Sequence, residues 1–195
     1  MLRYIVTFEV SELTPIPSGG TAKKCYNTPM AEKESENKYL HEVVITAIVV
    51  KGGKYLITRR SPNKKRFPGM WTVPGGKLET KDYLELPKDT EHYWYNVLEQ
   101  TLRREVKEEV GIEIDNIEYV TSLATVHADG SPSLVISCVA DYASGDITLQ
   151  EDELDTYKWV SLKEAKEYEL IDGIYDELAM AETQRTGKRS EWKRA

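Results

Sequence analysis

Three glutamates close together in the sequence are the residues best suited to carry chemistry. Glu105, Glu108 and Glu109 are spaced i, i+3 and i+4, so in a helix their carboxylates lie on one face. Carboxylate oxygens are the donors that Mg²⁺ and Mn²⁺ prefer, and the spacing therefore indicates a divalent-metal site. Arg104 precedes Glu108 by four residues and can orient it through a charge-assisted hydrogen bond.

A solvated acidic face is the alternative interpretation of these glutamates. They lie just before Gly111, at the end of the predicted helix, where the helix dipole destabilises an anion by roughly 0.3–1 kcal/mol. Like charges about 4 Å apart also repel by ~1 kcal/mol in water and by about 4 kcal/mol at an effective dielectric near 20. A bound divalent cation reverses the sign of both effects. The residues alone leave the metal site and the solvated face evenly balanced.

A helix is predicted over residues 90–110 to carry the glutamates. Its apolar face consists of residues spaced four apart: Trp94, Leu98, Leu102, Val106 and Val110. Asp89 or Thr90 can cap the start of this helix, and Gly111 can end it in the left-handed conformation.

Strands are predicted on both sides of this helix, at 41–50, 55–60, 117–127 and 133–142, with a short one that ends at 157–160. Tight turns join the first pair at 51–54 and the second pair at 129–132. Ser161 is expected to cap a short helix over 162–168, and another helix is predicted over 171–184. This order predicts an α/β fold, an α/β/α sandwich with a curved mixed sheet between helices.

The ends of the chain differ from its middle in composition. Residues 1–39 are predicted to form an N-terminal strand, at 2–10, followed by a polar connection. Residues 40–184 form the predicted compact domain, and 185–195 are expected to be a polar tail.

Composition and charge exclude several classes of protein. The chain has 195 residues, 40% of them hydrophobic, and a net charge of −7, which disfavours a binder of nucleic-acid polymers. Its only cysteines, Cys25 and Cys138, form no metal-binding pair and are expected to be reduced thiols. No transmembrane run or signal peptide is recognisable, and we therefore expect a cytoplasmic protein with no membrane partner.

A family resemblance adds to this interpretation. Gly76 together with residues 104–112 (REVKEEVGI) resembles the Nudix box of the MutT-like Nudix hydrolases. The segments YLITRR (55–60) and FPGMWTVPGGKLE (67–79) resemble the strand and the Pro-Gly-Gly loop that precede the box, and EDELDTYKWVSLKEA (151–165) resembles the closing part of the family's domain. The resemblance spans about residues 42–180 and implies the same sandwich fold.

The resemblance also implies roles for the site residues. Glu105, Glu108 and Glu109 would ligate one to three Mg²⁺ or Mn²⁺ ions, with the backbone carbonyl of Gly75 completing a site. Water activated at the metal would attack one phosphorus of a diphosphate, with Glu108 or Glu109 as the expected base. Arg104 would orient these carboxylates.

Two further groups of residues are implied around the metal. Glu153 is the expected additional acid, with Glu151 next, and an exposed acidic turn is the alternative. Arg59 and Arg60 end the strand that should point at the substrate, and guanidinium groups suit phosphate. Because adjacent strand residues face opposite ways, only one of the two arginines is expected to contribute. Arg59 is the family-like position.

The box departs from the family pattern at one place. The family's first glutamate is displaced, since counting forward from Gly76 gives Asp82 and counting back from Arg104 gives Asn96. The box is therefore split by about fourteen residues, near 83–96, which are expected to lengthen the helix toward its N-terminus and to enlarge the loop before it. Glu99 is a candidate substitute for the missing acid.

Three functions agree with the sequence. The first is a pyrophosphohydrolase of nucleoside triphosphates or modified dNTPs, although no asparagine after Asn116 is available to recognise 8-oxoguanine. The second is an ADP-ribose or nucleotide-sugar pyrophosphatase. Such enzymes often carry a proline soon after the box, whereas the first proline after Gly111 in this chain is Pro132. The predicted N-terminal strand would suit their dimers, so a homodimer is expected for this function. The third, a nucleotide-binding regulator without hydrolysis, is disfavoured because Arg104, Glu105, Glu108 and Glu109 are all present. In each case the partner is a small nucleotide-like diphosphate.

Overall fold

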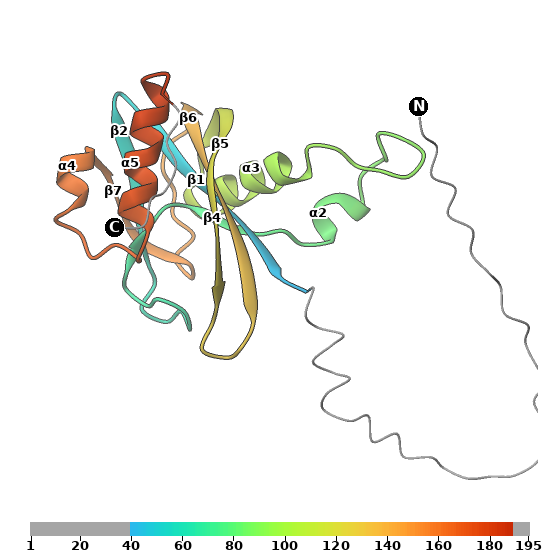
Figure 1. Cartoon of the computed structure of the whole chain (residues 1–195), viewed down its shortest axis with the longest axis horizontal. Coiled ribbons are helices and arrows are strands. Elements are labelled where there is room, and N and C mark those ends of the chain that lie inside the picture. The colour runs from blue at the N-terminus through green and yellow to red at the C-terminus, as the bar shows by residue number, and fades with distance from the viewer. Residues whose placement is uncertain (1–39, 189–195) are drawn as a thin grey trace, which may run out of the picture. The chain divides into compact units, whose positions relative to one another are not determined.

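Runs of β-branched residues build the middle of a seven-stranded sheet (Figure 1). The computed structural model describes residues 40–188. Its strands are β1 (Glu42–Lys51), β2 (Lys54–Arg60), β3 (Trp71–Thr72), β4 (Gly75–Lys77), β5 (Glu113–Val126), β6 (Pro132–Ser144) and β7 (Leu154–Val160). They pair in the order β3-β2-β1-β6-β5, with β4 added to β1 and β7 added to β2. Because β1 and β6 are parallel and the other pairs antiparallel, the sheet is mixed, as predicted.

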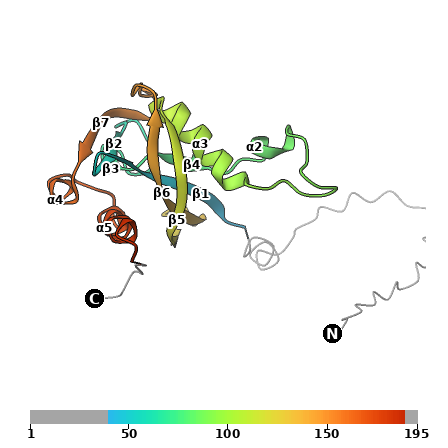
Figure 2. The same ribbon diagram turned by 90° about the horizontal axis from the view of Figure 1, so that it is seen from above.

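Helices cover both faces of this sheet. They are α2 (Lys81–Leu84), α3 (Val97–Val110), α4 (Leu162–Ala165) and α5 (Ile174–Arg185). Figure 2 shows α3 on one side of the sheet and α4 and α5 on the other. Leu102, Val106 and Val110 of α3 are fully buried in one core cluster, while Leu178 of α5 is buried in the second. The predicted α/β/α sandwich is therefore confirmed.

Capping residues and glycines in the sequence predicted most helix and strand ends to within a few residues of their observed positions. The Ser161 side chain accepts a hydrogen bond from the Glu164 N–H at 3.3 Å, and the Glu164 carboxylate accepts one from the Ser161 N–H at 2.7 Å, a reciprocal capping box. The helix after it is shorter than predicted and ends at Ala165, because the next N–H groups bond three residues back as turns. At the other end, α5 starts after Gly173, which has a φ of 90°.

The start of the glutamate-bearing helix was predicted wrongly. The helix begins at Val97 and not near Thr90, and Asn96 before it is left-handed, with a φ of 54° and no side-chain capping bond. Trp94 therefore lies outside the helix, despite its four-residue spacing. The end was predicted correctly, since Gly111 is left-handed with a φ of 78°.

The inserted residues do not lengthen α3 and instead fold as a separate arm. Asp89 donates its N–H to the Tyr93 carbonyl at 3.0 Å, and its carboxylate accepts the Tyr95 N–H at 2.8 Å. The Trp94 ring packs on Tyr83 of α2 with 5.3 Å between ring centroids, and its indole N–H donates to the Leu86 carbonyl at 3.0 Å. These turn bonds and ring contacts compete with helix formation, which explains the late start of α3.

Two predictions concern regions where the structure gives limited information. The N-terminal strand predicted at 2–10 and the final residues of the predicted tail, 189–195, lie outside the described residues. Between residues 40 and 188, no helix has both the length and the apolar character needed to cross a membrane.

A charged network around Glu42 fastens the start of β1 to two neighbouring segments. The Glu42 carboxylate accepts hydrogen bonds from Lys77 at 2.7 Å, from Arg66 at 2.7 Å and from the Ser133 hydroxyl at 3.0 Å. Arg66 also bonds Asp129 at 3.2 Å, so it ties the loop before β3 to the turn between β5 and β6. Lys77 and Arg66 together lower the pKa of Glu42 from 4.5 to about 2.

The Glu42 network predicts an acid-sensitive contribution to stability. A carboxylate whose pKa is lower in the folded state stabilises the fold above its unfolded pKa of 4.5, and this contribution is lost as the pH falls toward 2. Between pH 6 and pH 3, we expect wild type to lose on the order of 1 kcal/mol more unfolding free energy than Glu42→Gln. Urea unfolding at both pH values measures the difference, and equal losses in the two proteins would contradict it.

Candidate active site

Helix α3 presents Glu109 to the start of β4, and this glutamate is 8% exposed. The Gly75 N–H donates a hydrogen bond to its Oε2 at 2.9 Å. The pKa of Glu109 is raised from 4.5 to about 8, mainly by burial and also by the charges of Glu105 and Glu153, against the opposing effect of the Gly75 hydrogen bond. A carboxylate in this environment is poorly stabilised as an anion by the protein alone.

Glu105 lies one turn before Glu109 and packs on the same loop. A Cβ atom at Gly76 would overlap the Glu105 carboxyl group, and one at Gly75 would overlap the backbone carbonyl of Ile45 on β1. Only glycine at both positions lets the loop approach α3 and β1 this closely. Burial also raises the pKa of Glu105, while Arg104 lowers it. The Pro-Gly-Gly loop and α3 thus bring two carboxylates together.

Arg104 is the central cation of the cluster. Its guanidinium donates to Glu105 at 2.8 Å and to Glu108 at 2.8 Å, so the predicted pairing with Glu108 is present. It also donates to both carboxylate oxygens of Asp82, at 2.8 and 3.1 Å. Glu108 is more open to solvent than Glu105, with side-chain exposures of 53% and 15%.

Asp82, the residue reached by counting from Gly76, is a third carboxylate bound by Arg104. Its side chain is 2% exposed and, besides Arg104, accepts the Thr101 hydroxyl at 3.1 Å and the Glu79 N–H at 2.9 Å. These bonds fix α2 against α3 at the start of the inserted arm. Arg104 therefore finds its additional carboxylate in Asp82 and not in Glu99. The count from Gly76 reached Asp82, but no local pattern indicated that the chain would bring it back to Arg104.

The donor set of these residues fits a divalent cation. Glu105, Glu108 and Glu109 offer carboxylate oxygens on one face of α3, and Mg²⁺ and Mn²⁺ prefer such hard ligands. Within residues 40–188, however, no group of three or more Asp, Glu, His or Cys side chains is already arranged as a metal cage. Arg104 instead neutralises two of the three carboxylates. A cation at this position would have to replace part of the charge that Arg104 supplies.

The two arginines at the end of β2 face opposite sides of the sheet. Arg59 forms a two-pronged ion pair with Asp155 of β7, at 2.8 and 2.9 Å, and Trp71 lies beside it with 6.0 Å between the guanidinium carbon and the ring. Arg60 follows Leu56 and Thr58 on the alternating strand, and its positive charge lowers the pKa of Glu109. Arg60 also donates to the Arg66 carbonyl at 3.0 Å. Arg60 thus lies close enough to Glu109 to act on it electrostatically, whereas Arg59 is paired with Asp155.

Glu153 approaches the same site from the loop before β7. Its negative charge raises the pKa of Glu109, and its backbone carbonyl accepts the Ser61 N–H at 2.8 Å, which anchors the loop to the end of β2. The carboxylate forms an ion pair with Lys64. The structure thus brings Glu153 toward α3 with a lysine partner.

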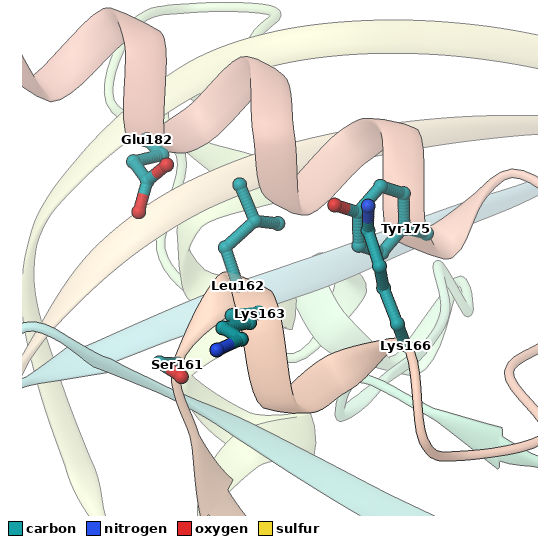
Figure 3. Close-up of a pocket in the computed structure, with 6 residues that line it drawn as sticks. All are labelled: Ser161, Leu162, Lys163, Lys166, Tyr175 and Glu182. Atoms are coloured by element: carbon teal, nitrogen blue, oxygen red, sulfur yellow. The ribbon is translucent and has the colours of Figure 1, made fainter.

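A separate pocket lies on the other side of the sheet (Figure 3). It lies between α4 and α5, and its lining consists of Ser161, Leu162, Lys163, Lys166, Tyr175 and Glu182. Its two lysines and Glu182 are exposed to solvent, and Lys166 lies over the Tyr175 ring at 5.2 Å. No buried charged group points into it, so it does not resemble the glutamate site.

Comparisons with known proteins agree with this geometry. The family model of the NUDIX domain matches residues 40–178. NAD-capped RNA hydrolase NudC of Pseudomonas aeruginosa is 34% identical over 116 residues, which are 59% of this chain and 34% of that protein. Nucleoside triphosphatase NudI of Klebsiella pneumoniae is 26% identical over 143 residues, covering 65% of this chain and 86% of that protein. The chain therefore spans about a third of the NudC relative.

Solved structures share the fold. A MutT NUDIX hydrolase from Burkholderia pseudomallei superposes with a TM-score of 0.57 and 21% identity, over 72% of this chain and 98% of that one. NudC, NudI and the Burkholderia pseudomallei protein are all named as hydrolytic enzymes, as the resemblance implied. Since the family model covers well over half of its residues, this chain belongs to the NUDIX family.

Proposed function

We propose that this protein is a divalent-metal-dependent hydrolase that cleaves a diphosphate linkage in a nucleoside-diphosphate-linked substrate. The observation that carries the proposal is the packing of Glu109 and Glu105 against Gly75 and Gly76, with Glu108 beside them on the same helix and joined to Glu105 through Arg104. Burial and mutual repulsion make this cluster unfavourable without positive charge, and a metal–diphosphate complex supplies that charge.

The three glutamates and the Gly75 carbonyl would hold Mg²⁺ or Mn²⁺. When bound, such an ion would acidify a water molecule and neutralise charge on the phosphate groups. The residues of the chain supply the rest. Glu108 is solvent-exposed and can accept a proton from the attacking water, with Glu109 and Glu153 as the other acids near it. Arg104 keeps Glu105 and Glu108 aligned for this work.

The first substrate class that we propose is a nucleoside triphosphate or modified dNTP. NudI, the relative that this chain covers for most of its length, is named as a nucleoside triphosphatase. The net charge of −7 also favours a small substrate that arrives with its own metal ion over an extended polyanion.

A dinucleotide or sugar-linked diphosphate, as in the ADP-ribose and nucleotide-sugar pyrophosphatases, is the second candidate. The NudC relative is named for hydrolysis of NAD-capped RNA, and its sequence identity to this chain is higher. A regulator without hydrolysis is the least favoured, because Arg104, Glu105, Glu108 and Glu109 are all in place.

A substrate panel with Glu108→Gln tests the proposed activity. Triphosphates, ADP-ribose, a nucleotide sugar, NAD⁺ and NAD-capped RNA are incubated with Mg²⁺ or Mn²⁺, and released phosphate, pyrophosphate or mononucleotide is measured. We expect turnover of at least one substrate and a fall in kcat of roughly 10²–10⁴-fold for Glu108→Gln. Glu99→Gln, an exposed glutamate on the same helix, is the matched control and should retain activity. An unaffected Glu108→Gln enzyme would refute the site.

Arg60 is proposed to bind a substrate phosphate, on the basis of its position near Glu109. Arg60→Ala should raise KM by about 10-fold or more, because a charge-assisted hydrogen bond contributes ~1.5–3 kcal/mol. Arg59→Ala breaks only the ion pair with Asp155 and should change KM little. Steady-state kinetics on the best substrate compares them, and a larger effect at Arg59 would reverse the assignment.

Asp82 is proposed as a positioning residue that acts through Arg104. In Asp82→Asn, Arg104 loses its buried partner and pairs more strongly with Glu105 and Glu108, so the cation must compete harder for them. We expect the metal concentration for half-maximal activity to rise about 10–100-fold, the range for residues that orient metal ligands. Asp82→Glu should restore most of the metal affinity. Thermal unfolding of each variant separates this effect from misfolding, and a normal metal dependence in folded Asp82→Asn would contradict the role.

A further inference from the structure

Strand β5 lies at the edge of the sheet, and its outer side is unpaired among the described strands. It pairs with β6 on one side only, whereas β6 lies between β1 and β5. In Figure 1 the hairpin of β5 and β6 reaches beyond the other strands at the lower side of the sheet. An edge of this length leaves backbone N–H and C=O groups free to pair with another strand.

The two halves of β5 differ in what protects them. The first half contains three acids, Glu113, Asp115 and Glu118, and irregularities in its pairing with β6 up to Thr121. There, Gln184 of α5 donates to Glu118 and to the Tyr119 carbonyl at 3.1 and 3.2 Å. Charges, bulges and a covering side chain are the devices that keep an edge from pairing.

The second half of β5 has none of these devices. Residues 121–126, TSLATV, carry no charged side chain, and their pairing with β6 is regular throughout. Ser122, Leu123 and Ala124 are consecutive exposed residues, so both faces of the strand are open as well as its edge. Val126 is 71% exposed. β-branched and apolar residues in this arrangement favour strand pairing.

We propose that this open half of β5 is the contact surface of a homodimer, in which two copies of the strand pair antiparallel across a two-fold axis. The open half of β5 is complementary to itself, because it is uncharged and two copies can pair along it without bringing like charges together. When 121–126 of one copy overlaps 126–121 of the other, the acids of each copy lie outside the overlap. In a parallel, in-register pair each acid would instead face itself, which is destabilising. The antiparallel arrangement is isologous and closes as a dimer, and it joins the two sheets into one. It does not depend on the proposed hydrolysis.

Sedimentation equilibrium of the full chain tests this proposal. Wild type should be a dimer at micromolar concentration, and the double variant Leu123→Lys, Val126→Lys should raise the dimer Kd roughly 10–100-fold by placing like charges at the pair. Leu134→Lys is the matched control: Leu134 is 37% exposed, as is Leu123, but lies on β6, whose two edges are already paired. It should leave the Kd unchanged.

Hydrogen exchange on the unaltered chain provides a second measurement that requires no variant. Amide protection over 121–126 should increase with protein concentration, in parallel with the dimer fraction. A monomeric wild type would overturn the proposal. So would a dimer that survives the double substitution, or one whose formation leaves exchange at 121–126 unchanged.

Discussion

Repulsion between carboxylates on one face of α3 is the constraint around which the site is organised. Glu109 is buried against the Gly75 N–H, Glu105 packs on Gly76, and Glu108 stands nearest to solvent. Arg104 touches two of these three carboxylates and Asp82 besides. Its single positive charge is too small to neutralise the cluster. A site with excess negative charge held rigidly by the fold is suited to a divalent cation, because the protein does not need to reorganise to stabilise it.

The scaffold explains why this strained arrangement persists. The apolar side of α3, with Leu102, Val106 and Val110, is fully buried, so the helix cannot turn its glutamates away from the loop. The glycines let the loop come within contact distance of both α3 and β1. Asp82 then fastens the inserted arm to the same helix, so an insertion in the middle of the box leaves the geometry of the glutamates intact. Packing thus provides the stability that the charges lack.

Periodicity and spacing predicted the features of the site that are local in sequence. The i, i+3, i+4 spacing of the glutamates, the Arg104–Glu108 pair and the left-handed Gly111 depend on residues within a few positions of one another, and the structure has all of them. The start of α3 was missed because Trp94 continues the apolar spacing, although its ring is held by Tyr83 and Leu86. Local pattern cannot reveal such a competing contact.

Contacts between distant segments could not be predicted from the sequence, because local patterns do not reveal which distant residues meet. Alternation along β2 predicts that Arg59 and Arg60 face opposite sides, but the pairing of β2 with β7 is irregular between them, and which side α3 covers is decided by the packing of the whole sheet. Asp82 and Arg104 are 22 positions apart, and only the folding of the arm returns one to the other. The open edge of β5 likewise depends on the strand order, which pairs β6 with β1 and leaves β5 outermost.

The central claim is that the glutamates of α3 hold a divalent cation, and anomalous scattering from a crystal soaked in Mn²⁺ tests it most directly. The account predicts an anomalous peak coordinated by Glu105, Glu108 and Glu109, with Arg104 moved away from at least one of them. Full occupancy by Arg104 with no peak at saturating Mn²⁺, or a peak only elsewhere on the molecule, would contradict it.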